Sequence, residues 1–286
     1  MRIEKDIKVV RELLNLEQKE LAELLGVSID SIVRWEQNLV QIDEKNLEVF
    51  FNFAYNKGIK INKIYEQLLY EDCENNDLKL LFHGAKSVIK FPVDLKHSKE
   101  NNDFGIGFYL GENFEQASTY ITNTISNYVY AFSIDIKNLN VIKFNVDTEW
   151  MLAVAYYRGW ITKYKKNEIV KKIIEKVAKA DIIIAPIADN RMFDLISDFV
   201  DGSITNEQCE HALSATNLGN QYVIKTTNGL NNLNFIKLFY LSSKEKEEYK
   251  NKRLENNIIN LDKVKVARIE YRGKGLYIDE MLTWKN

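Results

Sequence analysis

The chain has 286 residues, a formal net charge of -2 and an apolar content of 45 %, which are values of an ordinary globular protein with one large or two modest domains. It contains no apolar run of about 18 residues, and its amino-terminal segment lacks the apolar core of a signal peptide, so we expect no membrane span and a cytoplasmic location. The two cysteines, Cys73 and Cys209, lie far apart in sequence and predict neither a disulfide framework nor a zinc site. We expect no metal site.

The first 70 residues show a repeated helical pattern. Apolar positions recur at helical spacing over residues 3–14 and again over 18–25. Gly26 suits the tight turn that follows, and Ser28 suits the cap of the next helix, which begins at Ile29. Two further helices are expected within residues 43–70, separated at Gly58. The sequence therefore predicts a small all-helical domain.

The segment from Gln18 to Glu36 closely resembles the helix-turn-helix of the lambda-repressor and Cro-like (XRE) group. The resemblance implies that Gln18 contacts a DNA phosphate and that the second helix reads the major groove. The residues that would face the DNA, besides Gln18, are Ser28, Ile29, Asp30, Ser31 and Arg34. The segment is slightly acidic, whereas duplex affinity comes largely from neutralised phosphates. A dimerisation or partner-docking domain of the same fold is the alternative.

A second pattern occupies residues 79–121. A short apolar run ends in His83 and Gly84, and a polar loop of about twenty residues follows. A second strand, loosened by Gly105 and Gly107, then carries Tyr109, and a helix is expected after Asn113. Taken singly, His83 is compatible with a satisfied core histidine, and Tyr109 is one of 15 tyrosines.

The order of strand with His, polar loop, glycine-loosened strand with Tyr, and helix resembles the NAD-binding core of the diphtheria-toxin-like His–Tyr ADP-ribosyltransferases. It is more narrowly similar to uncharacterised bacterial ADP-ribosyltransferase-like proteins that follow small DNA-binding modules. The resemblance implies that NAD is a substrate, that His83 holds its ribose and that Tyr109 stacks on nicotinamide. It also implies that Gly84, Gly105 and Gly107 let the backbone approach the dinucleotide.

The third part of this predicted site is Gln221, at the start of a late strand. The His–Tyr transferases carry a glutamate there, which orients the nicotinamide ribose and stabilises its positive charge. A glutamine can donate to a hydroxyl but brings no negative charge. Three loop-borne carboxylates, Asp103, Glu149 and Asp189, are candidates to replace it, although caps and turns are the more common role of such residues.

Between these landmarks the pattern predicts a strand from Tyr128, a helix capped by Asp147, a basic amphipathic helix within 161–180 and a buried strand at 181–187. Two helices broken at Gly202 follow, the second capped by Thr205. Residues 242–261 read as a solvated charged helix, and 262–286 as two short strands with a basic surface. That surface suits either an edge strand or a docking site for nucleic acid.

We therefore predict an α+β protein with a helix-turn-helix domain at 1–72 and an ADP-ribosyltransferase-like split-sheet domain at 73–286, in which 242–286 is a candidate extension. The expected activity is NAD-dependent transfer of ADP-ribose to protein, DNA or RNA by a toxin-type or defence effector. Expected partners are DNA, an antitoxin or regulator, and a second copy in a homodimer. The alternative is a non-enzymatic transcriptional regulator that senses NAD or a related nucleotide.

Overall fold

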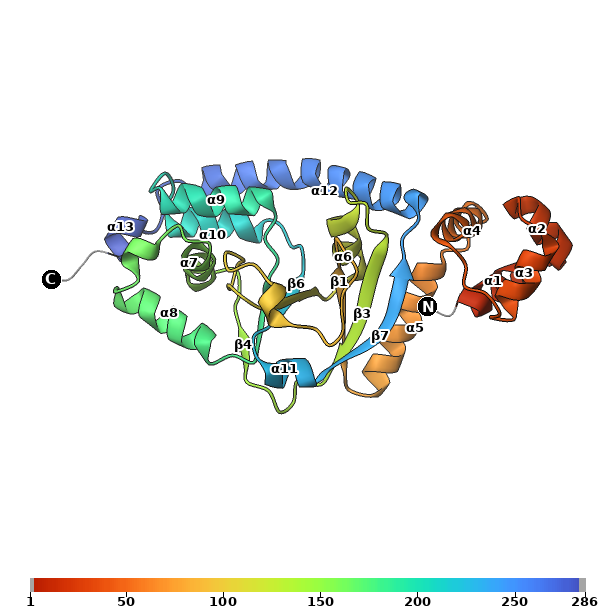
Figure 1. The fold of residues 1–286 in the computed structure, drawn as a ribbon. Coiled ribbons are helices and arrows are strands. Elements are labelled where there is room, and N and C mark those ends of the chain that lie inside the picture. The colour runs from red at the N-terminus through yellow and green to blue at the C-terminus, as the bar shows by residue number, and fades with distance from the viewer. Residues whose placement is uncertain (1–2, 283–286) are drawn as a thin grey trace.

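The computed structural model describes residues 3–282. Its amino-terminal part is a bundle of helices, as expected (Figure 1). These are α1 (Ile3–Leu13), α2 (Gln18–Leu25), α3 (Ile29–Glu36), α4 (Glu44–Asn56) and α5 (Ile61–Asn75). Because α5 continues to Asn75, the proposed domain boundary at 72–73 falls inside this helix.

The turn between α2 and α3 has the predicted chemistry. Gly26 adopts a left-handed conformation with φ of 68°, which favours glycine, and the Ser28 side chain accepts a hydrogen bond from the Ser31 backbone N–H. Leu21 and Ile32 are fully buried in the core of the bundle. The local sequence thus specifies both the turn and the angle between the two helices.

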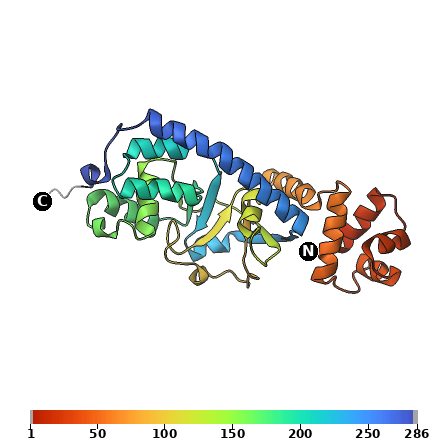
Figure 2. The ribbon, with the colours of Figure 1, turned by 90° about the horizontal axis from the view of Figure 1, so that it is seen from above.

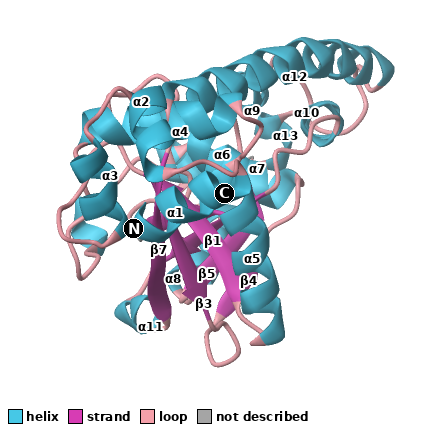
Figure 3. Ribbon diagram, turned by 90° about the vertical axis from the view of Figure 1, so that its right-hand side faces the viewer, coloured by secondary structure: helices cyan, strands magenta, loops and turns pink. Residues whose placement is uncertain are grey.

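The remainder of the protein is built on one mixed sheet of 7 strands in the order β4-β5-β6-β2-β1-β3-β7 (Figure 3). The strands are β1 (Lys79–Gly84), β2 (Phe108–Gly111), β3 (Tyr128–Ile134), β4 (Val141–Lys143), β5 (Ile182–Pro186), β6 (Asn220–Ile224) and β7 (Leu233–Tyr240). All neighbouring pairs are antiparallel except β4 and β5. The fold is therefore α+β, as predicted.

Helices pack on the sheet in two groups. Near one end, α6 (Phe114–Ile121) packs on β1, β2 and β3, while α7 (Thr148–Tyr157), α8 (Glu168–Ala178), α9 (Asn190–Val200) and α10 (Asn206–Ser214) form a lobe at the other end (Figure 1). The short elements are η1 (Leu95–His97), η2 (Thr162–Tyr164) and α11 (Thr227–Asn231). Asp147 and Thr205 cap α7 and α10 as the sequence indicates.

The carboxy-terminal region differs from the prediction. A single helix, α12 (Ser243–Glu270), replaces the expected short charged helix and the strands after it, and the short helix α13 (Ile278–Met281) follows. The helix continues because Val264 and Ala267 pack against the α7–α10 lobe and Gln208 donates to the Arg268 carbonyl at 2.6 Å. Seen from above, α12 runs along the protein from the amino-terminal bundle to that lobe (Figure 2).

The two parts of the chain share a buried contact. Tyr240, at the end of β7, belongs to the apolar core of the helical bundle. Asn62 on α5 donates to the Tyr240 carbonyl at 2.7 Å and to the Glu245 carboxylate on α12 at 3.0 Å. Among residues 3–282, no helix is both long and apolar enough to cross a bilayer.

Candidate functional site

The sheet is almost open between β1 and β2. These strands share a single ladder position, Phe82 opposite Gly111, whereas β1 pairs with β3 along its whole length. Beyond that position the His83 ring takes the place of a backbone partner, since its Nδ1 lies 2.7 Å from the Tyr109 carbonyl oxygen. The opening thus brings His83 and Tyr109 together.

The environment of His83 determines its protonation state. Burial lowers the pKa of His83, so the ring is neutral near pH 7. Because a carbonyl oxygen can only accept, Nδ1 carries the proton and Nε2 keeps a lone pair. The ring stacks on Phe108 with centroids 4.8 Å apart. Nε2 has no hydrogen-bond partner among the described residues, so it is available to accept from a ligand hydroxyl.

Tyr109 anchors the glycine-containing turn that precedes β2. Its hydroxyl donates to the Gly105 carbonyl at 2.7 Å and accepts from the Phe104 backbone N–H at 3.1 Å. Burial raises the pKa of Tyr109, so the phenol stays protonated under ordinary conditions. The hydroxyl therefore fixes the loop, and only the ring is left to meet a ligand.

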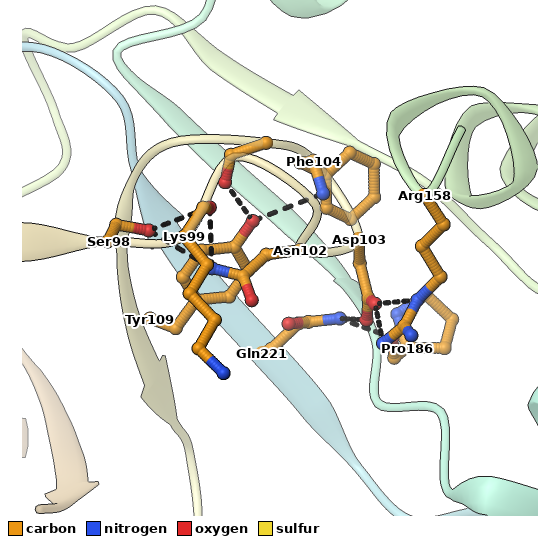
Figure 4. Close-up of polar contacts among 10 residues, drawn as sticks. Ser98, Lys99, Asn102, Asp103, Phe104, Tyr109, Arg158, Pro186 and Gln221 are labelled. Carbon is orange, nitrogen blue, oxygen red and sulfur yellow. Dashed lines mark hydrogen bonds and ion pairs between the residues drawn. The ribbon is translucent and has the colours of Figure 1, made fainter. Parts of the chain in front are cut away.

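Gln221 on β6 has a carboxylate beside it (Figure 4). Its Nε2 donates to Asp103 Oδ2 at 3.0 Å and to the Pro186 carbonyl at 3.1 Å. The other oxygen of Asp103 accepts from Arg158 Nε at 2.9 Å, and Arg158 Nη2 lies 2.8 Å from it. Gln221 and Asp103 are both buried. A negative charge thus lies one hydrogen bond from the glutamine.

The other two candidate carboxylates have structural partners. Asp189 caps α9 and pairs with Arg191 at 2.8 Å, although it borders the groove described below. Glu149 on α7 pairs with Lys176 at 2.6 Å and is not among the groove residues. Of the three, Asp103 alone contacts Gln221 in the described part of the chain.

His83, Tyr109 and Gln221 all line one groove, which has a volume of about 1790 Å³. Strand alternation places Tyr109 and Gln221 on the face that packs against the α7–α10 lobe, because Tyr109 is opposite Val223. His83 shares the opposite face with Leu81. The side chains reach a common groove because the sheet opens between β1 and β2.

The three predicted glycines each lie against other parts of the protein. A Cβ on Gly84 would lie 2.1 Å from the Ala117 carbonyl oxygen, and one on Gly107 would lie 2.6 Å from Val223 Cγ1. Gly105 has φ of 70°, and a Cβ there would lie 3.0 Å from the Tyr157 ring. Packing within the protein requires a small residue at all three positions, and Gly84 and Gly107 also line the groove.

The predicted DNA-facing residues lie on the surface of α3 and at its start. Ser28 and Ile29 are exposed, Ser31 is half-buried, and the exposed Arg34 lies 3.8 Å from the exposed carboxylate of Asp30. Gln18 donates to Glu36 Oε2 at 2.9 Å, and Glu36 also pairs with Arg11 at 2.7 Å. One of the two amide hydrogens of Gln18 is therefore used inside the domain.

Comparison with protein families agrees with this division. Residues 79–235, more than half of the chain, match the model described as "Protein of unknown function (DUF3990)". The chain belongs to the DUF3990 family. Residues 7–50 of this DUF3990 protein match a helix-turn-helix model, which confirms the predicted module. Neither the curated proteins nor the solved structures give a match.

Sequence reasoning missed two residues of the site in this DUF3990 protein. Arg158 follows α7 and holds Asp103 while its guanidinium lies 3.5 Å from the centroid of the Phe193 ring. Gln116 on α6 lines the groove, and both polar atoms of its carboxamide are buried with no hydrogen-bond partner. Neither belongs to a recognisable motif, because both depend on contacts between distant segments.

Proposed function

We propose that this protein transfers ADP-ribose from NAD to a macromolecule and acts inside cells as a toxin-type or defence effector. The observation that carries the proposal is the convergence of His83, Tyr109 and Gln221 on one groove with the Asp103 carboxylate beside Gln221. These residues come from separate strands and a loop, and their types were expected from the sequence before their positions were known.

The reaction needs groups of the kind found here. The bond between the ribose C1′ and the nicotinamide nitrogen breaks, and its electron pair leaves with nicotinamide. A lone pair of the acceptor forms the new bond to C1′, and the acceptor proton passes to water. Positive charge develops on the ribose, so a nearby negative charge lowers the barrier. Asp103 supplies that charge, and Gln221 fixes the carboxylate and the ribose hydroxyls.

The groove residues fit NAD. His83 Nε2 accepts from a ribose hydroxyl, and the half-buried ring of Tyr109 offers an apolar face to nicotinamide. Gln116 has a carboxamide with an unused donor and an unused acceptor in the groove wall, which suits a polar ligand that makes both kinds of hydrogen bond. The group that binds here therefore needs donors, acceptors and a planar ring.

Nicotinamide release from NAD tests the proposal. We expect the wild-type protein to release nicotinamide, and His83→Ala and Gln221→Ala to reduce the rate by about 10- to 100-fold, because each misplaces the reacting ribose. His211→Ala is the matched control, since His211 stacks on Tyr271 away from the groove. Absence of release by the wild type, or an equal loss in the control, contradicts the proposal.

The ion pair at Asp103 favours a second candidate, a transcriptional regulator that senses NAD without consuming it. Arg158 offsets the charge of Asp103, and a neutralised carboxylate stabilises an oxocarbenium-like state less well. Saturable NAD binding by calorimetry without nicotinamide release supports the sensor. Arg158→Met distinguishes the transferase from the sensor, since only the transferase would show a changed rate of nicotinamide release.

In either case we infer that the helix-turn-helix module brings the protein to duplex DNA. The exposed Ile29 at the start of α3 and the exposed Arg34 in its last turn support this assignment. Binding to phosphates predicts that affinity for duplex DNA falls as salt rises, and that Arg34→Ala weakens it. An affinity that does not depend on salt contradicts DNA recognition by this surface.

A further inference from the structure

The middle of α12 has its polarity reversed. A helix on a globular protein normally turns apolar residues inward and polar residues outward. Here Arg253, Asn256, Asn257 and Asn260 face the groove, whereas Ile258 on the outer side is 69 % exposed. The inner face of this segment therefore suits a polar ligand rather than an apolar core.

The opposite wall of the groove offers an aromatic ring. Tyr120 on α6 is 60 % exposed, and Lys86 Nζ lies 5.1 Å from the centre of its ring. Gln116, one helical turn before Tyr120, carries the unpartnered carboxamide. An exposed ring next to a cation can stack on a planar base.

The groove carries no large excess of positive charge, because nine Lys or Arg and eight Asp or Glu side chains line it and four of the cations are held in ion pairs. Lys252 pairs with Glu248 at 3.2 Å, Arg191 with Asp189 at 2.8 Å, and Arg158 with Asp103 at 2.8 Å. A surface for duplex DNA needs many unpaired cations to neutralise phosphates. A wall rich in asparagine instead complements base edges, because each carboxamide both donates and accepts. Those edges are accessible in single strands.

The size of the groove leaves room for such a strand beside NAD. Its volume of about 1790 Å³ exceeds the roughly 300–1,000 Å³ of a typical small-molecule site. The α12 segment and Tyr120 border the same groove as His83 and Gln221. A strand bound there would thus occupy the same groove as the predicted site of nicotinamide loss.

We propose that the groove between α12 and α6 binds a single-stranded nucleic acid and presents an unpaired base as the acceptor of ADP-ribose. The acceptor role rests on the proposed transferase function, whereas strand binding does not require NAD. In the transfer a base nitrogen or oxygen donates its lone pair to C1′, the bond from C1′ to nicotinamide breaks, and the acceptor proton passes to water.

Fluorescence anisotropy of the full chain with labelled homopolymeric 12-mers of DNA and RNA, without NAD, tests the binding. We expect Asn256→Ala/Asn260→Ala and Tyr120→Ala each to weaken single-strand binding by about tenfold or more. Asn251→Ala is the matched control, because it lies on the same helix but outside this groove. Circular dichroism confirms that each variant is folded.

Several results overturn the proposal. The first is absence of single-strand binding by the wild type, and the second is an equal loss of binding in Asn251→Ala. The third is loss of single-strand binding in Arg34→Ala, which would assign the binding to the helix-turn-helix. The fourth is binding of peptides in place of oligonucleotides. Nicotinamide release by the wild type without oligonucleotide is measured separately. Release without strand binding removes only this inference, and strand binding without release removes only the transferase function.

Discussion

The contact between Gln221 and Asp103 can be tested by exchanging its two functional groups. In Asp103→Asn two amides face one another, and in Gln221→Glu two carboxylates do so across a contact that is now 3.0 Å. Asp103→Asn can keep the hydrogen bond from Gln221 only by turning its new NH2 group toward Arg158, so it loses the ion pair. Gln221→Glu places two carboxylates against each other and removes the donor to the Pro186 carbonyl. The double variant restores one acceptor opposite one donor between these two side chains, with the charge moved from the loop to β6, but it leaves the Pro186 carbonyl without its amide donor.

The magnitude follows from the exposure of the ion pair. The Asp103 and Arg158 side chains are 10 % and 27 % exposed, so the pair lies between a buried and a surface salt bridge. Losing its charge-assisted hydrogen bonds should cost about 2 kcal/mol of unfolding free energy in Asp103→Asn. We expect the double variant to be about 1–2 kcal/mol more stable than the sum of the single changes.

Urea unfolding followed by tryptophan fluorescence and circular dichroism measures these free energies, provided that the two transitions coincide. Nicotinamide release, measured on the same proteins, should recover in the double variant relative to Asp103→Asn, since a carboxylate is again present at the site. If the stability effects add within about 0.5 kcal/mol, the two groups do not interact and our reasoning about the site is wrong.

Two further predictions concern the walls of the groove. Burial lowers the pKa of His83, so below pH 6.5 the unfolded chain binds more protons than the folded protein. The contribution of His83 to the unfolding free energy should therefore fall as the pH decreases below 6.5. Above that pH its contribution should not change. His83→Gln should reduce this dependence in urea titrations at pH 5.5 and 7.5, and an unchanged slope contradicts it. Gly84→Ala should destabilise the protein by about 2 kcal/mol or more, because the new methyl group meets a backbone oxygen at 2.1 Å. Gly111→Ala, whose methyl group would lie 3.0 Å from the Gln116 side-chain oxygen and no closer than 3.6 Å to any other neighbour, should cost less than about 1 kcal/mol, and equal costs would refute the packing explanation.

Local patterns predicted much of the fold. Gly26 and Ser28 identified the turn of the helix-turn-helix, and Asp147 and Thr205 identified two helix starts, because capping chemistry depends on neighbours in sequence. The carboxy-terminal strands were wrong. There the alternation of Lys263 to Val266 indicated a strand, but contacts with the distant α10 determined a helix.

The site was predictable only in its residue types. His83, Tyr109 and Gln221 could be named from strand order, and Asp103 was one of three equivalent carboxylates until the fold placed it beside Gln221. The reason for the glycines could not be foreseen, since the Ala117 carbonyl and the Val223 side chain that exclude a Cβ lie on other elements. Arg158 and Gln116 were missed for the same reason.

The buried seam at Tyr240 limits how the two ends of the protein can cooperate. Because this tyrosine completes the core of the amino-terminal bundle and α12 begins three residues beyond it, the bundle is not tethered by a free linker. A nucleic acid bound by α3 would then have a fixed orientation and a fixed distance relative to the groove. Geometry, more than affinity, would then decide which stretch of a bound strand is modified.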